Sequence, residues 1–379
     1  MLLPRPSICY LKVITLALGL ILLQSCNKRN SYKKLQNIPE DDTAFAVSGE
    51  TITLSGEKVA YLLRKDAKIN NVYKIGENGS ITIYKKGLDY LLTPMGGIKR
   101  TAKSLIPDFS HHQVKLNRNG KFTFKPGPDR NPETTLKWQV MVDYSTHLDS
   151  MIKFKGGFLS NDLKEKIRAK KDISIYCIGT SISAGAHTVQ VFFNGMNTSV
   201  YVQLIAKAIT KLYKNKVLVT NLAEGGATTQ LFTEKLEEIK LKKPDLIFIE
   251  FGMNEHGADN RILYHLQAIE AGVKSLISEK IDCVLIGFFQ QNLDFELEKP
   301  SYTMYFNRKL KEISEKNNVF FADIYERFNQ FPKEKVYNDL LGDYLHHPTD
   351  FGHQIYYLTT VPVILFGDKK ESELLRIIE

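Results

Sequence analysis

From about residue 159 to residue 323, short apolar runs alternate with longer stretches that carry apolar residues at helical spacing. The apolar runs are rich in β-branched and aromatic residues, which is typical of buried strands. Short buried strands separated by helices predict a parallel sheet with helices on both faces, a three-layer α/β/α architecture. The predicted strands are 173–179, 216–222, 245–252, 282–289 and 318–323, and the predicted helices are 159–171, 200–213, 232–242, 259–280 and 301–316.

Residues 45–146 show a different pattern, in which short alternating runs are separated by turn residues rich in Gly, Asn and Pro. Several short strands with regular turns predict a small β-sandwich. We expect this part to brace the α/β domain, with a carbohydrate-binding surface as the alternative. The predicted strands include 51–54, 80–84, 121–124 and 136–144, and the predicted domains are 45–158 (β-sandwich) and 159–379 (α/β).

The N-terminus has the pattern of an export signal. Arg5 and Lys12 precede an apolar run, 13–23, which is too short to span a bilayer comfortably but fits a signal-peptide core. The run ends in Leu23-Gln24-Ser25-Cys26, which resembles a bacterial lipobox. This resemblance implies a signal peptide at 1–25, a lipidated Cys26 and a tether at 26–44. The protein would then be exported and held at the cell envelope, at the outer membrane or cell surface rather than the inner membrane; a plain signal peptide or a signal anchor is the alternative.

Composition narrows the classes of partner. The 379 residues are 43% hydrophobic and 25% charged, as in ordinary globular proteins, and the net charge is +9. The lysines are scattered among acidic residues, so we expect no nucleic-acid partner. Cys177 and Cys283 lie in apolar runs and are expected to be buried thiols rather than a disulfide or a metal pair.

Polar segments follow the predicted strands of the α/β domain. In a parallel sheet the carboxyl ends of the strands meet at one edge, where ligands bind. These segments supply a hydroxyl, a double glycine, an amide and an Asp–His pair, which are the groups that acyl transfer needs. An ordinary helix cap is the alternative for the first segment. The segments are Gly179-Thr180-Ser181, Asn221–Thr228, Gly252–Glu255 and Asp343–His353.

In the same order, these segments resemble the four signature blocks of the SGNH hydrolases, also called the GDSL family. Gly179-Thr180-Ser181 stands where the family usually has Gly-Asp-Ser, and Gly252-Met253-Asn254-Glu255 resembles its Gly-x-Asn-Asp block. The resemblance covers roughly residues 170–360 and implies a flavodoxin-like fold and ester hydrolysis without a cofactor. Thr180 and Glu255 depart from the family's two Asp residues. The chain has no Gly-x-Ser-x-Gly, which disfavours a nucleophile-elbow hydrolase.

The resemblance also implies roles for individual residues. Ser181 would be the nucleophile, His347 its base and Asp343 the carboxylate that orients the base. The oxyanion hole would consist of the backbone N–H groups of Ser181 and Gly226 and the side-chain amide of Asn254.

The choice of base has an alternative. His346 has the family's usual three-residue spacing from Asp343, but His347 has the proline that usually follows the base. We expect His347 to be the base, because a four-residue spacing brings side chains together on one helical turn.

The remaining histidines are assigned as follows. We expect no metal, although His346, His347 and His353 as metal ligands are an alternative. His187 and His256 lie near the predicted site and are expected to touch substrate. His353 is expected to be structural, as are His111, His112 and His147.

These observations predict an exported, lipid-anchored serine esterase that removes acetyl groups from a polysaccharide. Its partners would be an acetylated glycan, or another small ester, and the membrane that holds Cys26. A lipase or lysophospholipase is the neighbouring alternative, although the sequence shows no long apolar lid, and an acyltransferase could use the same residues. A catalytically inactive, glycan-binding surface lipoprotein is a further alternative, motivated by Thr180 and Glu255.

Overall fold

The computed structural model of the protein describes residues 44–76, 79–123, 134–147, 153–188, 200–255 and 261–378. The predicted signal peptide, Cys26, His256 and the predicted tether up to residue 43 lie outside the described residues. Among the helices that the structure describes, none is both long and apolar enough to cross a membrane.

A five-stranded parallel sheet forms the centre of the C-terminal part, in the order β10-β9-β11-β12-β13. Strands β9 and β11, which each have a neighbour on both sides, are buried along almost their whole length, which explains their continuous apolar sequence. The edge strand β10 is half-exposed. The predicted α/β/α fold is thus confirmed. The strands are β9 (Ile173–Gly179), β10 (Val217–Asn221), β11 (Leu246–Glu250), β12 (Asp282–Ile286) and β13 (Phe320–Ala322).

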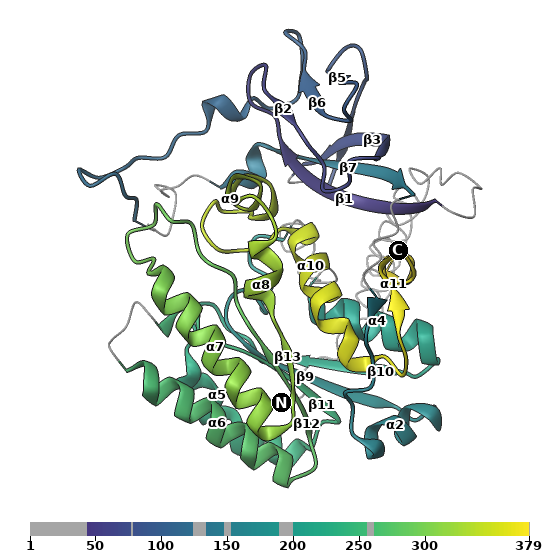
Figure 1. The fold of residues 1–379 in the computed structure, drawn as a ribbon, viewed down its shortest axis with the longest axis vertical. Coiled ribbons are helices and arrows are strands. Elements are labelled where there is room, and N and C mark those ends of the chain that lie inside the picture. The colour runs from purple at the N-terminus through teal and green to yellow at the C-terminus, as the bar shows by residue number, and fades with distance from the viewer. Residues whose placement is uncertain are drawn as a thin grey trace, which may run out of the picture.

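Two groups of helices cover the sheet (Figure 1). One group consists of α4 (Tyr201–Tyr213) and α10 (Asp350–Thr360), and the other of α5 (Thr229–Lys242), α6 (Ile262–Ser278) and α7 (Pro300–Asn317); α11 (Glu371–Ile378) packs on α4 and β1. Helix α5 begins before the predicted residue 232, because the Thr228 side chain caps it by accepting from the N–H of Gln230. Shorter helices are α2 (Asn161–Arg168), α8 (Ile324–Asn329) and α9 (Lys333–Lys335), which is followed by the π-helical turn η4 (Val336–Leu340).

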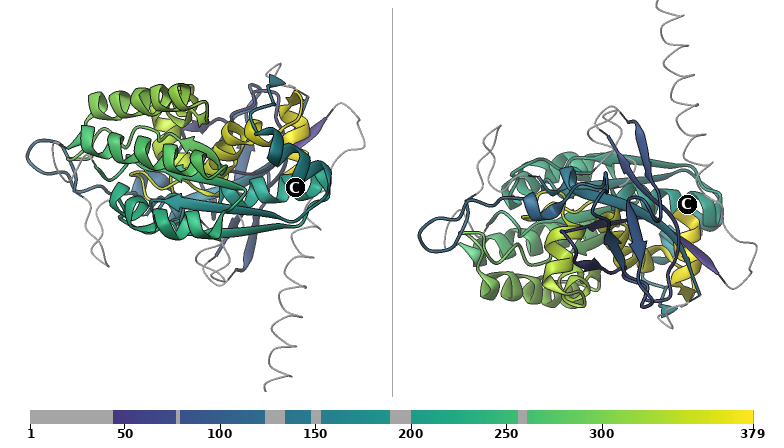
Figure 2. Two further views of the ribbon diagram at one scale, coloured as in Figure 1. Left: turned by 90° about the horizontal axis from the view of Figure 1, so that it is seen from below. Right: turned by 90° about the horizontal axis from the view of Figure 1, so that it is seen from above.

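The N-terminal part is antiparallel and β-rich, as predicted. Its larger sheet has the order β1-β7-β3-β4 and its smaller sheet the order β2-β6-β5. In the three views β1 lies over α10 and α11 of the α/β part (Figures 1 and 2). The strands are β1 (Phe45–Thr53), β2 (Val59–Ala60), β3 (Lys68–Ile75), β4 (Ile81–Tyr84), β5 (Tyr90–Leu92), β6 (Ile98–Arg100) and β7 (Gln139–Thr146); β8 (Lys153–Phe154) pairs instead with β14 (Lys369–Lys370).

The prediction that residues 121–124 add a strand to the N-terminal sheets is wrong for the part that the structure describes. Phe122 forms an isolated bridge with Phe295 of the α/β part. It is buried there in a small cluster with Phe295 and Leu345. The burial of this aromatic ring decides its position, and a local alternating pattern carries no information about the surface that will cover it.

Strand β7 is buried at all eight positions, whereas its alternating sequence predicts one exposed face. Its polar residues are buried because they have hydrogen-bond partners. Asp143 accepts from the N–H of Gly49 and the hydroxyl of Tyr73, and the Gln139 amide donates to backbone carbonyls at residues 338–341. One continuous apolar core extends from this sheet into the α/β part.

Candidate active site

Ser181 lies in the turn that follows β9. In the sheet, Gly179 at the end of β9 is paired with Glu250 of β11. A Cβ atom on residue 179 would lie 2.7 Å from the carbonyl oxygen of Glu250, so the close approach of the two strands requires glycine. The turn that carries Ser181 is therefore fixed to the carboxyl end of the sheet, as the sequence predicts.

Asp343 organises a loop, residues 342–347, rather than a helical turn. Its Oδ1 atom accepts the backbone N–H groups of residues 345, 346 and 347 at 2.9, 3.0 and 3.0 Å. The predicted helical turn is wrong, because this carboxylate satisfies the backbone donors in place of helical carbonyls. The four-residue spacing between Asp343 and His347 still brings the two side chains together, since the loop folds around Asp343.

The structure brings together three of the predicted residues in one hydrogen-bonded chain. Nε2 of His347 lies 2.8 Å from Oγ of Ser181, and Nδ1 of His347 lies 2.5 Å from Oδ2 of Asp343. An ionised carboxylate only accepts hydrogen bonds, so Nδ1 of His347 carries the proton. In the neutral ring Nε2 is then an acceptor, and the Ser181 hydroxyl donates to it.

Electrostatics keep Asp343 ionised although it is buried. Burial alone would raise the pKa of its carboxyl group. The contact with His347, with smaller contributions from His346 and His187, outweighs burial and holds the pKa of Asp343 well below its usual range. The carboxylate is therefore charged at neutral pH and can stabilise an imidazolium at His347.

Two further histidine rings lie against His347, and a third histidine, His353, packs against tyrosine rings. The half-buried ring of His187, at a positive φ of 62°, stacks on His347 with 4.8 Å between the centroids, and the ring of His346 lies 4.1 Å from His347. His353 is fully buried against the rings of Tyr201 and Tyr356, and burial lowers its pKa to about 3. His353 is thus neutral and part of the packing.

Within the described residues, His187, Asp343 and His347 form a group whose possible metal-ligating atoms lie within 4.8 Å of one another. Two of these residues already share a hydrogen bond through Nδ1 of His347. A metal ion bound through Nδ1 of His347 would displace this proton, and one bound through Nε2 would take the lone pair that faces Ser181. The same atoms therefore cannot serve a metal and the chain to Ser181 together.

The predicted oxyanion donors lie in the turns after the neighbouring strands. The Glu224 N–H donates to the carbonyl of Gly179 at 3.1 Å, which holds the turn of Gly226 beside the end of β9. Gly226 has a φ of +76°, a conformation that favours glycine. The amide of Asn254 donates to the carbonyl of Ala227 at 2.8 Å and so joins the turn after β11 to the turn after β10.

Residues 177–355 match the GDSL-like lipase/acylhydrolase family. These residues therefore form a serine ester hydrolase domain of this family. No curated protein sequence matches the chain.

Solved structures similar to the hydrolase include a lipase/acylhydrolase from Enterococcus faecalis (22% identity, TM-score 0.43, covering 50% of this chain and 93% of that one). An acetylxylan esterase from Geobacillus stearothermophilus has 20% identity and a TM-score of 0.38, covering 49% of this chain and 91% of that one. A two-domain esterase active on acetylated mannans has 17% identity and a TM-score of 0.41, covering 57% of this chain and 52% of that one.

Glu250 is a residue of the hydrolase site that the sequence analysis missed. Its fully buried carboxyl group accepts from the N–H of Thr180 at 3.1 Å, from the hydroxyl of Thr180 at 2.8 Å and from the hydroxyl of Ser183 at 3.1 Å. These contacts hold the residues on both sides of Ser181. One feature of the sequence could have identified Glu250: it is a single acidic residue directly after the apolar run 246–249.

Glu255 performs a similar task in the turn that carries Asn254. It accepts from the N–H of Gly252 at 2.8 Å and from the N–H of Thr229, at the start of α5, at 3.0 Å. Burial raises the pKa of Glu250 and of Glu255 to about 7, and the charge of Glu250 contributes to the shift of Glu255. Thr180 and Glu255, the two departures from the family pattern, therefore both take part in the hydrogen bonding of these turns.

The raised pKa of Glu250 predicts a pH-dependent stability. The folded protein retains a proton that the unfolded chain releases between pH 4.5 and about 7, so the free energy of unfolding falls as pH rises through this window. Glu250→Gln removes this titration. We compare the free energy of unfolding of Glu250→Gln with that of wild type. As the pH is raised from below to above this window, we expect the difference to change by about 3 kcal/mol in favour of the variant.

Urea unfolding at several pH values measures this difference. Glu237→Gln is the matched control, since it makes the same substitution at an exposed carboxylate, which pairs with Lys240 at 2.9 Å. Parallel pH profiles for wild type and Glu250→Gln would show that Glu250 titrates normally.

Proposed function

We propose that Ser181, His347 and Asp343 are a catalytic triad for the hydrolysis of carboxylic esters. The observation that carries this proposal is the continuous chain from Oγ of Ser181 through the ring of His347 to Asp343. Nε2 of His347 takes the hydroxyl proton as Oγ attacks the ester carbonyl carbon, and Asp343 stabilises the resulting imidazolium.

The remaining steps return the enzyme to its starting state. The tetrahedral intermediate expels the alcohol, which receives the proton from Nε2 of His347, and the acyl group stays on Ser181. His347 then deprotonates a water molecule that attacks the acyl-enzyme. The second tetrahedral intermediate collapses to the free acid, and the proton returns to Ser181.

The negative oxygen of each intermediate needs donors opposite the base. We assign this role to the backbone N–H groups of Ser181 and Gly226 and to the amide of Asn254. A primary amide has two N–H donors, of which Ala227 takes one and thereby orients the group. Such preorganised donors usually contribute a large share of the rate.

For the substrate we propose an acetyl ester of a carbohydrate. The ring of His347, which contacts Ser181, lies against the imidazole rings of His187 and His346, and the amide of Asn254 lies in the turn after the neighbouring strand β11. Polar surroundings of this kind suit a hydroxylated sugar better than a long acyl chain. The lipobox-like sequence before Cys26 supports a place at the cell envelope, where such polymers are exposed.

The triad assignment predicts different results for the two neighbouring histidines. Ser181→Ala and His347→Ala should each lower kcat for p-nitrophenyl acetate by about 10⁴-fold or more. His346→Ala, the matched control, should retain most of the activity. Loss of activity in His346→Ala but not in His347→Ala would contradict the assignment, and equal near-zero rates for wild type and Ser181→Ala would indicate an inactive binding protein.

The proposed substrate class predicts that acetate is released from acetylated polysaccharides. We expect kcat/KM to be higher for these and for p-nitrophenyl acetate than for long-chain p-nitrophenyl esters or lysophospholipids. Acetate release is measured across a panel of acetylated glycans, with Ser181→Ala as the blank. A preference for the long acyl chains would instead identify a lipase or lysophospholipase.

The proposed anchor predicts that the full-length protein incorporates a fatty acid at Cys26. In a bacterial host that processes lipoproteins, metabolic labelling with a radioactive fatty acid should mark the wild type and not Cys26→Ser. Cell fractionation should place the wild type in the envelope fraction. Equal labelling of both proteins, or none of either, would contradict lipidation at Cys26.

A further inference from the structure

The loop 342–347, here called the acid–base loop, is closed at its base. Leu341 and Pro348 form an antiparallel bridge, and the N–H of Thr349 donates to the carbonyl of Leu340 at 2.8 Å. The loop holds Asp343 and His347, so their position relative to Ser181 depends on how this base is fixed. The loop follows the last strand of the parallel sheet, so no strand pairing of that sheet holds it.

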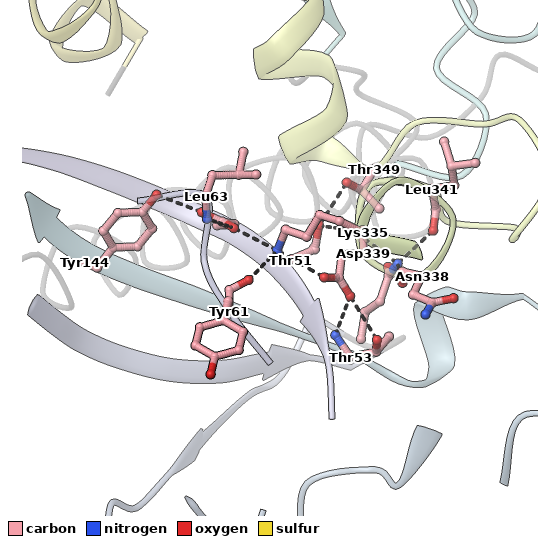
Figure 3. Close-up of polar contacts among 12 residues, drawn as sticks. Thr51, Thr53, Tyr61, Leu63, Tyr144, Lys335, Asn338, Asp339, Leu341 and Thr349 are labelled. Atoms are coloured by element: carbon pink, nitrogen blue, oxygen red, sulfur yellow. Dashed lines mark hydrogen bonds and ion pairs between the residues drawn. The ribbon is translucent and has the colours of Figure 1, made fainter. Parts of the chain in front are cut away.

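Thr51 of β1 contacts both sides of this base. Its hydroxyl donates to the carbonyl of Asp339 at 2.5 Å and lies 3.1 Å from the hydroxyl oxygen of Thr349 (Figure 3). Thr349 is also the N-cap of α10. All three residues are buried. One hydroxyl from the N-terminal sheet therefore connects the segment before the acid–base loop to the helix after it.

Donors from residues 134–139 reach the carbonyls next to the loop. The Gln139 amide donates to the carbonyls of Asn338 at 2.8 Å and Leu341 at 2.7 Å, and the Thr135 hydroxyl donates to Leu341 at 2.5 Å. The carbonyl of Gly342, directly before Asp343, accepts from the hydroxyl of residue 134 at 2.6 Å and the N–H of residue 136 at 3.2 Å.

A buried group of charges fixes the preceding turn to the same sheet. Asp339 accepts from the N–H and hydroxyl of Thr53 at 2.8 and 2.9 Å (Figure 3). Lys335 lies 3.0 Å from the carboxylate of Asp339 and 2.9 Å from that of Glu50. Burial disfavours the charged form of Lys335, but Asp339 and Glu50 outweigh it and raise the pKa of its ammonium group.

We propose that the N-terminal β region positions the general base, and that Thr51, Thr135 and Gln139 are positioning residues for His347. The inference rests on the triad proposed above. The carbonyls of residues 338, 339, 341 and 342 each receive a donor from residues 51–139. Without these donors the buried carbonyls lose their partners, and the base of the loop is free to move.

A movement of the loop affects the chemical step more than substrate binding. His347 must lie within hydrogen-bond reach of Ser181 to take its proton, and a displacement of about 1 Å costs on the order of 100-fold in rate. The proposed oxyanion donors lie outside the loop, in the turns after β9, β10 and β11. A displaced loop should therefore lower kcat and leave KM unchanged.

The test removes hydroxyl groups without changing side-chain shape. In the full chain we expect Thr51→Val/Thr135→Val to lower kcat for p-nitrophenyl acetate by about 10- to 100-fold, at constant KM. Thr51→Ser/Thr135→Ser keeps both donors and should restore most of kcat. Thr146→Val is the matched control: the Thr146 hydroxyl is also buried in the N-terminal sheet, but it donates to Asp66 at 2.6 Å.

Proton NMR of the downfield Nδ1–H of His347 gives a second readout, since weakening of the contact with Asp343 should shift or broaden this resonance. Urea unfolding of all variants shows how much stability each one loses. The single variants Thr51→Val and Thr135→Val are measured alongside, so that unfolding of the double variant leaves the comparison intact.

The inference is overturned if the valine variants lose stability as Thr146→Val does but keep the kcat and the resonance of wild type. It is also overturned if only KM changes. Ser181→Ala, measured in the same assay, tests the triad itself. Retained activity in Ser181→Ala removes the proposed function, whereas loss in Ser181→Ala with wild-type kcat in the valine variants removes the positioning role alone.

Discussion

The site depends on how the two oxygens of one carboxylate, that of Asp343, are used. Oδ1 accepts three backbone N–H groups of its own loop, and Oδ2 accepts Nδ1–H of His347. A buried carboxylate without such partners would be costly and would become protonated. Here the same hydrogen bonds shape the loop, keep the charge and select the tautomer of His347. Because the loop shape, the charge and the tautomer are all set in this way, Nε2 of His347 faces Ser181 with a lone pair that can accept its hydroxyl hydrogen.

The proposed nucleophile and the proposed base are held by different parts of the molecule. The position of Ser181 is set by the parallel sheet. Gly179 is paired with Glu250, and the Glu250 carboxyl group accepts hydrogen bonds from Thr180. His347 is held by a loop outside that sheet. The alignment of the two therefore requires a rigid connection between the parallel sheet and the loop, and the continuous core and the buried contacts of β1 and β7 supply it.

The sequence alone predicts the strands of the parallel sheet and the polar segments at their carboxyl ends, because hydrophobic periodicity and the residue types at strand ends are local signals. The sequence alone does not predict the contacts between segments that are far apart along the chain. Glu250 lies in an apolar strand, and its role depends on strand register with β9. Phe122 and Gln139 belong to alternating patterns, but they are buried by residues about 170 to 200 positions away. The expected helical turn failed because Asp343 competes for the backbone donors of its loop.

These long-range contacts also explain why the polar residues of the N-terminal sheet are buried. An independent β-sandwich would place residues such as Thr51 and Gln139 in solvent, where their hydrogen-bonding groups need no protein partner. Here the segment that leads into the acid–base loop has buried carbonyl groups at residues 338, 339 and 341. The Thr51 hydroxyl on β1 and the Gln139 amide on β7 donate to these carbonyls, and apolar side chains in the same places would remove these hydrogen bonds. The polar residues of the N-terminal sheet thus supply hydrogen-bond donors to the carbonyl groups that lead into the acid–base loop.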